Sequence, residues 1–157
     1  MIQGKFILGQ EHMSELHKIW EEVFVKEAGL PKDQVCKEKY GKSIHAMVYV
    51  GSDLTCPVAA GSLAVNADFA ELERIAVLRD YRGKQYGDFL VRMLLDKANS
   101  AGIQNIFVRV PDSEKEFFLK LGFIEQREEL NSFGLPCISM KYSNNMIRKC
   151  CKEKSTN

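Results

Sequence analysis

The chain has 157 residues, of which 45% are hydrophobic and 27% charged, and its formal net charge is +1. This length suits one domain with a sizeable core. The near balance of charge argues against a nucleic-acid partner, which normally meets a strong basic excess. No apolar run approaches the length of a membrane span, and no signal peptide is visible at residues 1–10. We therefore expect a cytoplasmic protein without a membrane partner.

The five cysteines stand at positions 36, 56, 137, 150 and 151. They are odd in number and lack the spacing of a zinc site. This usage is typical of reduced thiols in a cytosolic protein. The sequence therefore favours a fold with neither a disulfide framework nor a bound metal.

The first part of the chain alternates apolar runs with one amphipathic segment. We expect a strand at 5–8, a helix at 11–28 that ends at Gly29 and Pro31, and a second short helix within 32–40. Trp20 and Phe24 lie on the apolar side of the long helix, where core packing is their simplest role. Apolar runs at 44–50 and 58–65 flank a loop of moderate length and predict an antiparallel hairpin.

Residues 71–110 predict a strand, a basic loop, a helix and a second strand. Strict alternation over 71–78 would place Glu71, Glu73, Ile75 and Val77 on one face, and Leu72, Arg74, Ala76 and Leu78 on the other. A helical apolar stripe follows over 86–101, and Gly102 suits the left-handed residue that ends such a helix. With the strand at 103–110 this makes a βαβ unit, whose two strands should be parallel neighbours.

The basic loop lies where the chain enters the helix. Arg82 and Lys84 supply cations, and Gly83 and Gly87 let a ligand approach the backbone. Because a helix start has unpartnered N–H groups and the positive end of the dipole, it can hold a diphosphate. The loop matches neither a P-loop nor a dinucleotide fingerprint. A basic helix start without any ligand is the alternative.

The last part of the chain predicts a further helix and two strands. Asp112 or Ser113 can cap a helix through residue 120, with Pro111 just ahead of it. A strand should start at 122–124, and a final strand at 138–142 should pair back across 131–136. Residues 143–157 are polar and lysine-rich, which predicts a solvated tail or a frayed helix.

Three segments resemble one family. The run Arg82-Gly83-Lys84-Gln85-Tyr86-Gly87, after a strand ending in Val77, resembles the signature of the GNAT superfamily of acyl-CoA-dependent N-acyltransferases. Gln85 departs from it, since the family normally has glycine there. The run FFLKLGF at 117–123 is similar to a second family segment. VFVKEAGLP at 23–31 resembles a run of one GNAT subgroup that often has a histidine where His45 stands.

The resemblance implies an α/β fold (α+β type) in a single GNAT acetyltransferase domain over 1–142, followed by the tail at 143–157. Its sheet would be mixed and six- to seven-stranded, with an antiparallel N-terminal half, a central splayed pair of parallel strands and about four helices. The implied function is transfer of the acetyl group of acetyl-CoA to a primary amine of a small-molecule or peptide acceptor, by direct attack on the thioester. A homodimer is common in relatives.

The resemblance also implies roles for individual residues. The backbone of Ile75, Ala76 and Val77 would bind the pantetheine arm and meet the developing oxyanion. The coenzyme diphosphate would rest on Arg82, Gly83, Lys84, Gln85, Tyr86 and Gly87. Glu71 matches the position of a general base, and Glu73 on the same face can share that role. A solvated strand edge is the alternative for the two glutamates.

One matching position departs from the expected chemistry. Phe118, expected at the cofactor, stands where relatives carry the tyrosine that protonates the leaving thiolate, and phenylalanine has no proton to donate. Since a thiol has a pKa of about 8.5, the thiolate leaves fairly well without help. Pro111 stands where relatives often have a coenzyme-contacting asparagine. The alternative function is therefore a CoA-binding or regulatory module that has lost turnover.

Overall fold

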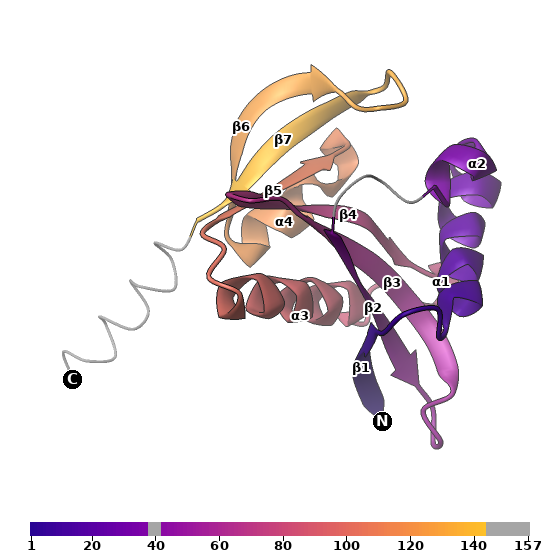
Figure 1. The fold of residues 1–157 in the computed structure, drawn as a ribbon. Coiled ribbons are helices and arrows are strands. Elements are labelled where there is room, and N and C mark those ends of the chain that lie inside the picture. The colour runs from indigo at the N-terminus through magenta and orange to yellow at the C-terminus, as the bar shows by residue number, and fades with distance from the viewer. Residues whose placement is uncertain (38–41, 144–157) are drawn as a thin grey trace. The chain divides into compact units, whose positions relative to one another are not determined.

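The computed structural model describes residues 1–37 and 42–143, which contain seven strands and four α-helices (Figure 1). The chain divides into an N-terminal unit, Met1–Gln104, and a C-terminal unit that begins at Asn105. The predicted single domain over 1–142 stays a prediction. Most of the predicted tail, including the cysteines at 150 and 151, lies outside the described residues.

The N-terminal unit is built on an antiparallel sheet in the order β1-β2-β3-β4. Its strands are β1 (Ile2–Ile7), β2 (Lys42–Val50), β3 (Cys56–Val65) and β4 (Phe69–Val77). The predicted hairpin of β2 and β3 is confirmed. The first strand begins earlier than expected, because Ile2 pairs with Val50 and the ladder runs the whole length of β1.

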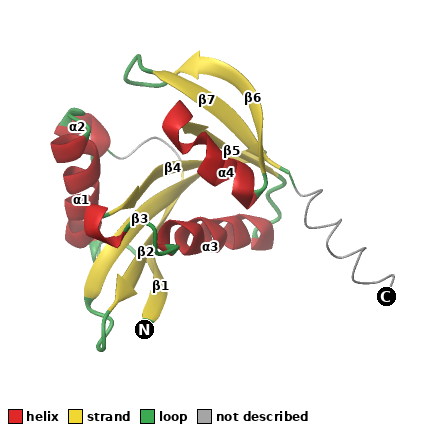
Figure 2. Ribbon diagram, turned by 180° about the vertical axis from the view of Figure 1, so that it is seen from behind, coloured by secondary structure: helices red, strands yellow, loops and turns green. Residues whose placement is uncertain are grey.

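Helices α1 (Met13–Trp20) and α3 (Tyr86–Ser100) cover opposite faces of this sheet (Figure 2). A Cβ atom built on Gly61 would meet Leu90 and Leu94 of α3. The next residue, Ser62, contacts His45, whose ring packs on Trp20 of α1. Because neighbouring residues of a strand point to opposite faces, the two helices lie on either side. We call these the α3 face and the α1 face.

The helix predicted over 11–28 has a different second half. After α1 the chain continues as a π-helix, η1 (Glu21–Glu27). Gly29, which has φ +73°, follows the end of this helix. A π-turn holds an additional residue per turn, so side chains beyond Trp20 rotate away from the α-helical stripe. This explains why η1 has no fully buried side chain. The second helix, α2, spans Lys32–Val35.

Strand β4 contains a bulge that overturns half of the predicted face assignment. Glu73 pairs with Ser62 and Ala76 pairs with Ala60, so Arg74 and Ile75 together oppose Gly61. The alternation therefore shifts by one residue at this point. Glu71 and Glu73 share a face as predicted. Ile75, predicted on that face, contacts the Gly61 position on the α3 face. Ala76, predicted on the other face, lies on the side of the glutamates.

The C-terminal unit contains three antiparallel strands in the order β5-β7-β6, accompanied by α4 (Lys115–Leu121). Its strands are β5 (Asn105–Val110), β6 (Phe123–Leu130) and β7 (Pro136–Tyr142). The final strand pairs back on β6 as expected. The predicted Asp112 or Ser113 cap is wrong: the N-cap of α4 is Glu114, which makes no side-chain cap hydrogen bond. A 3₁₀ turn precedes it, in which the Glu114 N–H donates to the Pro111 carbonyl.

The expected pair of parallel strands takes β4 from one unit and β5 from the other. Every pairing within the two units is antiparallel. In the described parts of the chain, no helix combines the length and apolar character needed to span a membrane.

We predict that Gly61→Ala lowers the free energy of unfolding by about 1 kcal/mol or more, because an added Cβ overpacks the α3 face. The nearest atom to that Cβ would be Ile75 Cδ1 at 2.5 Å. Ile75→Val removes this methyl group. The double variant should therefore lose less free energy of unfolding than the two single variants lose when their losses are added. Urea unfolding of all four proteins measures the coupling, and strict additivity would contradict this packing.

Candidate functional site

Two glutamates of β4 lie side by side on the α1 face. Glu71 pairs with Ala64 and Glu73 with Ser62, so both side chains leave the sheet in the same direction. Glu71 is half-buried, whereas Glu73 is only 9% exposed. Arg74 brings its Nη2 atom to 4.0 Å from Glu73 Oε2. The cation offsets part of the cost of burying a carboxylate.

A polar row crosses the same face. His45, Ser62 and Glu73 are direct neighbours across β2, β3 and β4. His45 Nδ1 and Ser62 Oγ share a hydrogen bond of 2.6 Å, and both residues are buried. His45 attracted notice in the sequence only through the subgroup likeness. Ser62 gave no signal at all, because a serine inside an apolar strand looks like any small core residue.

The main chain of Ile75, Ala76 and Val77 forms the end of β4, directly after the bulge. The Val77 carbonyl accepts a hydrogen bond from Arg82 Nε at 2.9 Å. The next residue, Leu78, donates its N–H to the Val58 carbonyl. The strand end is thus held from both the loop and β3, which fixes the direction of its backbone groups.

The loop between β4 and α3 offers exposed backbone at a helix start. Arg82, Gly83, Lys84 and Gln85 are exposed, and Tyr86 and Gly87 are half-buried. The first N–H groups of α3 precede the hydrogen bond from Phe89 N to Gln85 O and so lack partners within the helix. These groups, with the helix dipole, suit an anion.

Gln85, the departure from the family signature, has a left-handed backbone conformation, which glycine adopts freely. Its φ is +68°, and that of Gly83 is +76°. A left-handed conformation costs a non-glycine residue about 1–2 kcal/mol. The loop therefore keeps the shape that glycine would give it, at some cost in stability.

Arg82 is engaged within the protein. Besides its bond to Val77, it donates from Nη2 to Glu27 Oε1 at 2.9 Å. Arg79 Nη2 lies 3.8 Å from the other oxygen of Glu27. Glu27 thus ties η1 to the loop through two arginines. Sequence reasoning overlooked this residue, although it stands within the segment that resembles the GNAT subgroup.

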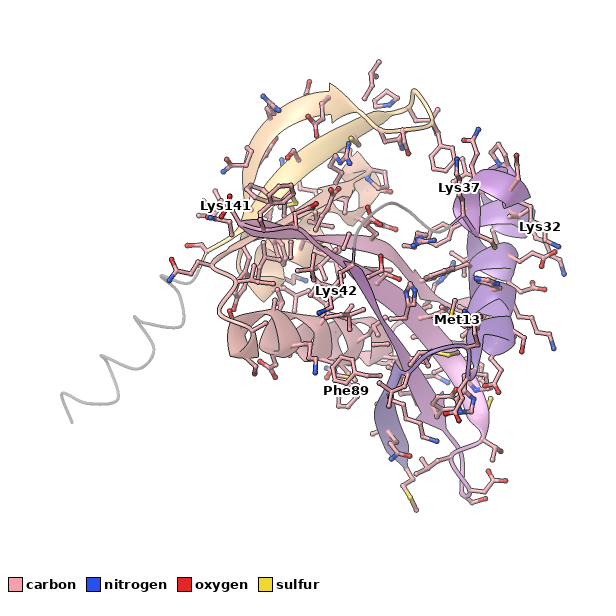
Figure 3. All side chains as sticks on the ribbon, in the orientation of Figure 1. Met13, Lys32, Lys37, Lys42, Phe89 and Lys141 are labelled. Atoms are coloured by element: carbon pink, nitrogen blue, oxygen red, sulfur yellow. The ribbon has the colours of Figure 1, made fainter. Side chains whose placement is uncertain are left out.

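A depression of about 390 Å³ lies beside the first turn of α3. Its lining includes Lys84, Gln85, Phe89 and Arg92. Lys84 Nζ lies 5.6 Å from the Tyr81 ring centroid, and Arg92 Nε donates to Asp88 Oδ1. Phe89, labelled in Figure 3, extends from α3 toward Gly4 of β1. Aromatic and cationic groups together suit an anionic ligand that also carries a flat ring.

Phe118 belongs to the other unit, apart from the residues above. It is 2% exposed, and its ring meets Phe117 and Phe123 edge-on at 5.0 and 5.3 Å. It serves as a core residue of the C-terminal unit.

Tyr81 and Tyr142 carry phenol groups, which can donate a proton where Phe118 cannot. Tyr142 is buried against Phe123 within the C-terminal unit. Tyr81 Oη lies 3.6 Å from Cys56 Sγ, and this contact raises the pKa of Tyr81. A higher pKa makes Tyr81 a weaker acid than an ordinary phenol.

Within residues 1–37 and 42–143, no group of three or more His, Cys, Asp or Glu side chains could hold a metal ion. The cysteines described there, Cys36, Cys56 and Cys137, form no disulfide.

The chain is similar in sequence to known proteins. The family described as "Acetyltransferase (GNAT) family" matches residues 12–123. The uncharacterized N-acetyltransferase YjcF of Bacillus subtilis (strain 168) is 29% identical over 133 residues, which cover 83% of this chain and 92% of YjcF.

Solved structures share the fold at lower identity. Escherichia coli ElaA superposes with a TM-score of 0.75 at 18% identity, covering 91% of this chain and 100% of ElaA. The PaiA N-acetyltransferase of Thermoplasma acidophilum, solved with coenzyme A, gives 0.67 at 18% identity, covering 91% and 99%. These neighbours confirm the predicted α/β fold class. Together with the family match they show that the chain belongs to the GNAT family of acetyltransferases.

Proposed function

We propose that the protein is an acetyl-CoA-dependent N-acetyltransferase whose acceptor is a primary amine on a small molecule or peptide. The supporting observation is the layout of β4. One strand carries an acid pair on the α1 face, and the loop that follows this strand leads to an exposed, positively charged helix start. An acyl transfer between a cationic amine and a polyanionic coenzyme needs these two environments close together.

Coenzyme binding divides between backbone and side chains. The N–H groups of Gly83 to Gly87, with the Lys84 ammonium, hold the diphosphate. The main chain of Ile75 to Val77 holds the pantetheine arm. Arg82 acts by bracing the loop against Val77 and Glu27, so its contribution to binding is the shape of the loop as well as charge.

The reaction begins with loss of a proton from the acceptor. A free alkyl ammonium has a pKa near ~10, so a base must help at neutral pH. Glu71 or Glu73 accepts this proton, directly or through water, and the neutral amine attacks the thioester carbonyl. A backbone N–H near Ile75 to Val77 that meets the oxyanion can contribute roughly 3–4 kcal/mol. The C–S bond then breaks without a proton from Phe118. The attacking nitrogen gives its second proton to the departing thiolate or to water, which leaves a neutral amide and the free thiol.

A CoA-binding or regulatory module is the second candidate. It is favoured by the apolar surroundings of Phe118 and by the strained Gln85 at the phosphate loop. Release of free thiol from acetyl-CoA with a panel of amines separates the candidates. We expect turnover with at least one amine. Coenzyme binding without turnover on any amine would favour the module.

We predict that Glu71→Gln or Glu73→Gln lowers kcat by about 100-fold or more, since a positioned general base contributes roughly 10²–10⁴ in rate. Glutamine keeps the size of the side chain and removes its ability to accept the proton. Initial-rate kinetics measure the effect. Glu128→Gln, at an exposed position of β6, is the matched control and should keep the full rate. Two active-site variants at the wild-type rate would refute the assignment.

We predict that Arg82→Ala raises the Kd for acetyl-CoA about tenfold, because the loop loses both a cation and its brace. Calorimetric titration gives the value. Arg127→Ala removes an exposed arginine of β6 and should leave Kd unchanged. An unaltered Kd in Arg82→Ala would show that the diphosphate binds elsewhere.

A further inference from the structure

Trp20 and Arg74 interlock where α1 meets the bulge of β4. Trp20 is fully buried, and its indole Nε1–H donates to the Arg74 carbonyl at 2.8 Å. The Arg74 guanidinium lies 4.1 Å from the centroid of the same ring. One aromatic side chain therefore engages both the main chain and the side chain of Arg74.

The Arg74 guanidinium continues the contact beyond α1. Its Nη1 atom donates to the carbonyls of Val35 at 2.9 Å and Lys37 at 3.3 Å. Lys37, labelled in Figure 3, follows the end of α2. The bulge is thus connected to both α1 and α2.

The backbone at Arg74 needs such support. Its φ is +52°, a left-handed conformation that residues with a Cβ rarely adopt. A donor that binds the carbonyl of a residue in this conformation stabilises it relative to the extended alternative. Extended backbone at Arg74 would restore strict alternation, which would turn Ile75 and Ala76 to the opposite faces and rotate the main chain that follows.

We propose that Trp20 is a positioning residue, which holds the bulge of β4 so that Glu73 and the backbone of residues 75–77 take up their working orientations. This inference rests on the proposed function. Trp20 reaches no reacting atom in this account. Trp20 acts by donating a hydrogen bond to the Arg74 carbonyl. Its indole ring also packs against the Arg74 guanidinium and so keeps Arg74 beside Glu73.

Trp20→Phe tests the proposal, since it keeps an aromatic ring and removes the donor. We expect kcat to fall about tenfold and the KM for acetyl-CoA to rise with it, because the backbone of residues 75–77 both meets the oxyanion and holds the pantetheine arm. Tyr49→Phe is the matched control, because it also removes one hydrogen bond between the sheet and α1, to Glu15. Tyr49 stands three residues along β2 from Ala46, which pairs with Gly61. This variant should keep the wild-type kcat. Wild-type kcat in Trp20→Phe, or an equal loss in Tyr49→Phe, would overturn the proposal.

A double-mutant comparison tests the mechanism. Glycine adopts positive φ freely, so in an Arg74→Gly background the bulge no longer depends on the indole. The change Trp20→Phe should then lower kcat less than threefold. A loss of tenfold in both backgrounds would show that Trp20 acts by another route.

Hydrogen exchange separates this inference from the proposed function. Amides of residues 74–77 should exchange faster in Trp20→Phe than in the wild type. In Tyr49→Phe they should exchange at the wild-type rate. If the wild type shows no turnover with any amine, the proposed function fails and this measurement alone decides. Equal exchange rates in Trp20→Phe and wild type would then refute the proposal that Trp20 holds the bulge of β4.

Discussion

One additional residue in β4, opposite Gly61, sets the geometry of the site. It allows Glu71 and Glu73 to face α1 while Ile75 packs under α3, within a strand of nine residues. A regular strand could not place these groups so, because its faces alternate without exception. The glutamates, the end of the strand and the loop that follows all take their directions from this point.

Two arginines near the candidate site form hydrogen bonds with other residues of the protein. Arg74 donates hydrogen bonds to the carbonyls of Val35, the last residue of α2, and of Lys37. Arg82 donates to Val77 and Glu27. A guanidinium has five donors in a fixed fork, so it can hold backbone and carboxylate at once. In the proposed function, Arg82 therefore contributes to coenzyme binding largely by holding the loop, alongside Lys84 and the N–H groups at the start of α3.

The two departures from the family pattern, Gln85 and Phe118, have different physical consequences. Gln85 changes the residue and keeps the left-handed backbone, so the shape of the loop survives. Phe118 removes a proton donor outright, and its ring is surrounded by other aromatic rings. The first departure affects stability, and the second affects how the thiolate must leave.

Periodicity and local motifs depend on neighbouring residues, so the order of the elements, the pair of glutamates, the basic helix start and the family resemblance could all be predicted from the sequence. Contacts between distant segments were needed to show that Arg74 is left-handed, that the second half of the first helix is a π-helix, and that Glu27 and Ser62 lie beside the predicted site residues. An alternating pattern reads the same with or without a bulge. The insertion becomes visible only when β3 supplies the opposing register and Trp20 supplies a donor for the displaced carbonyl.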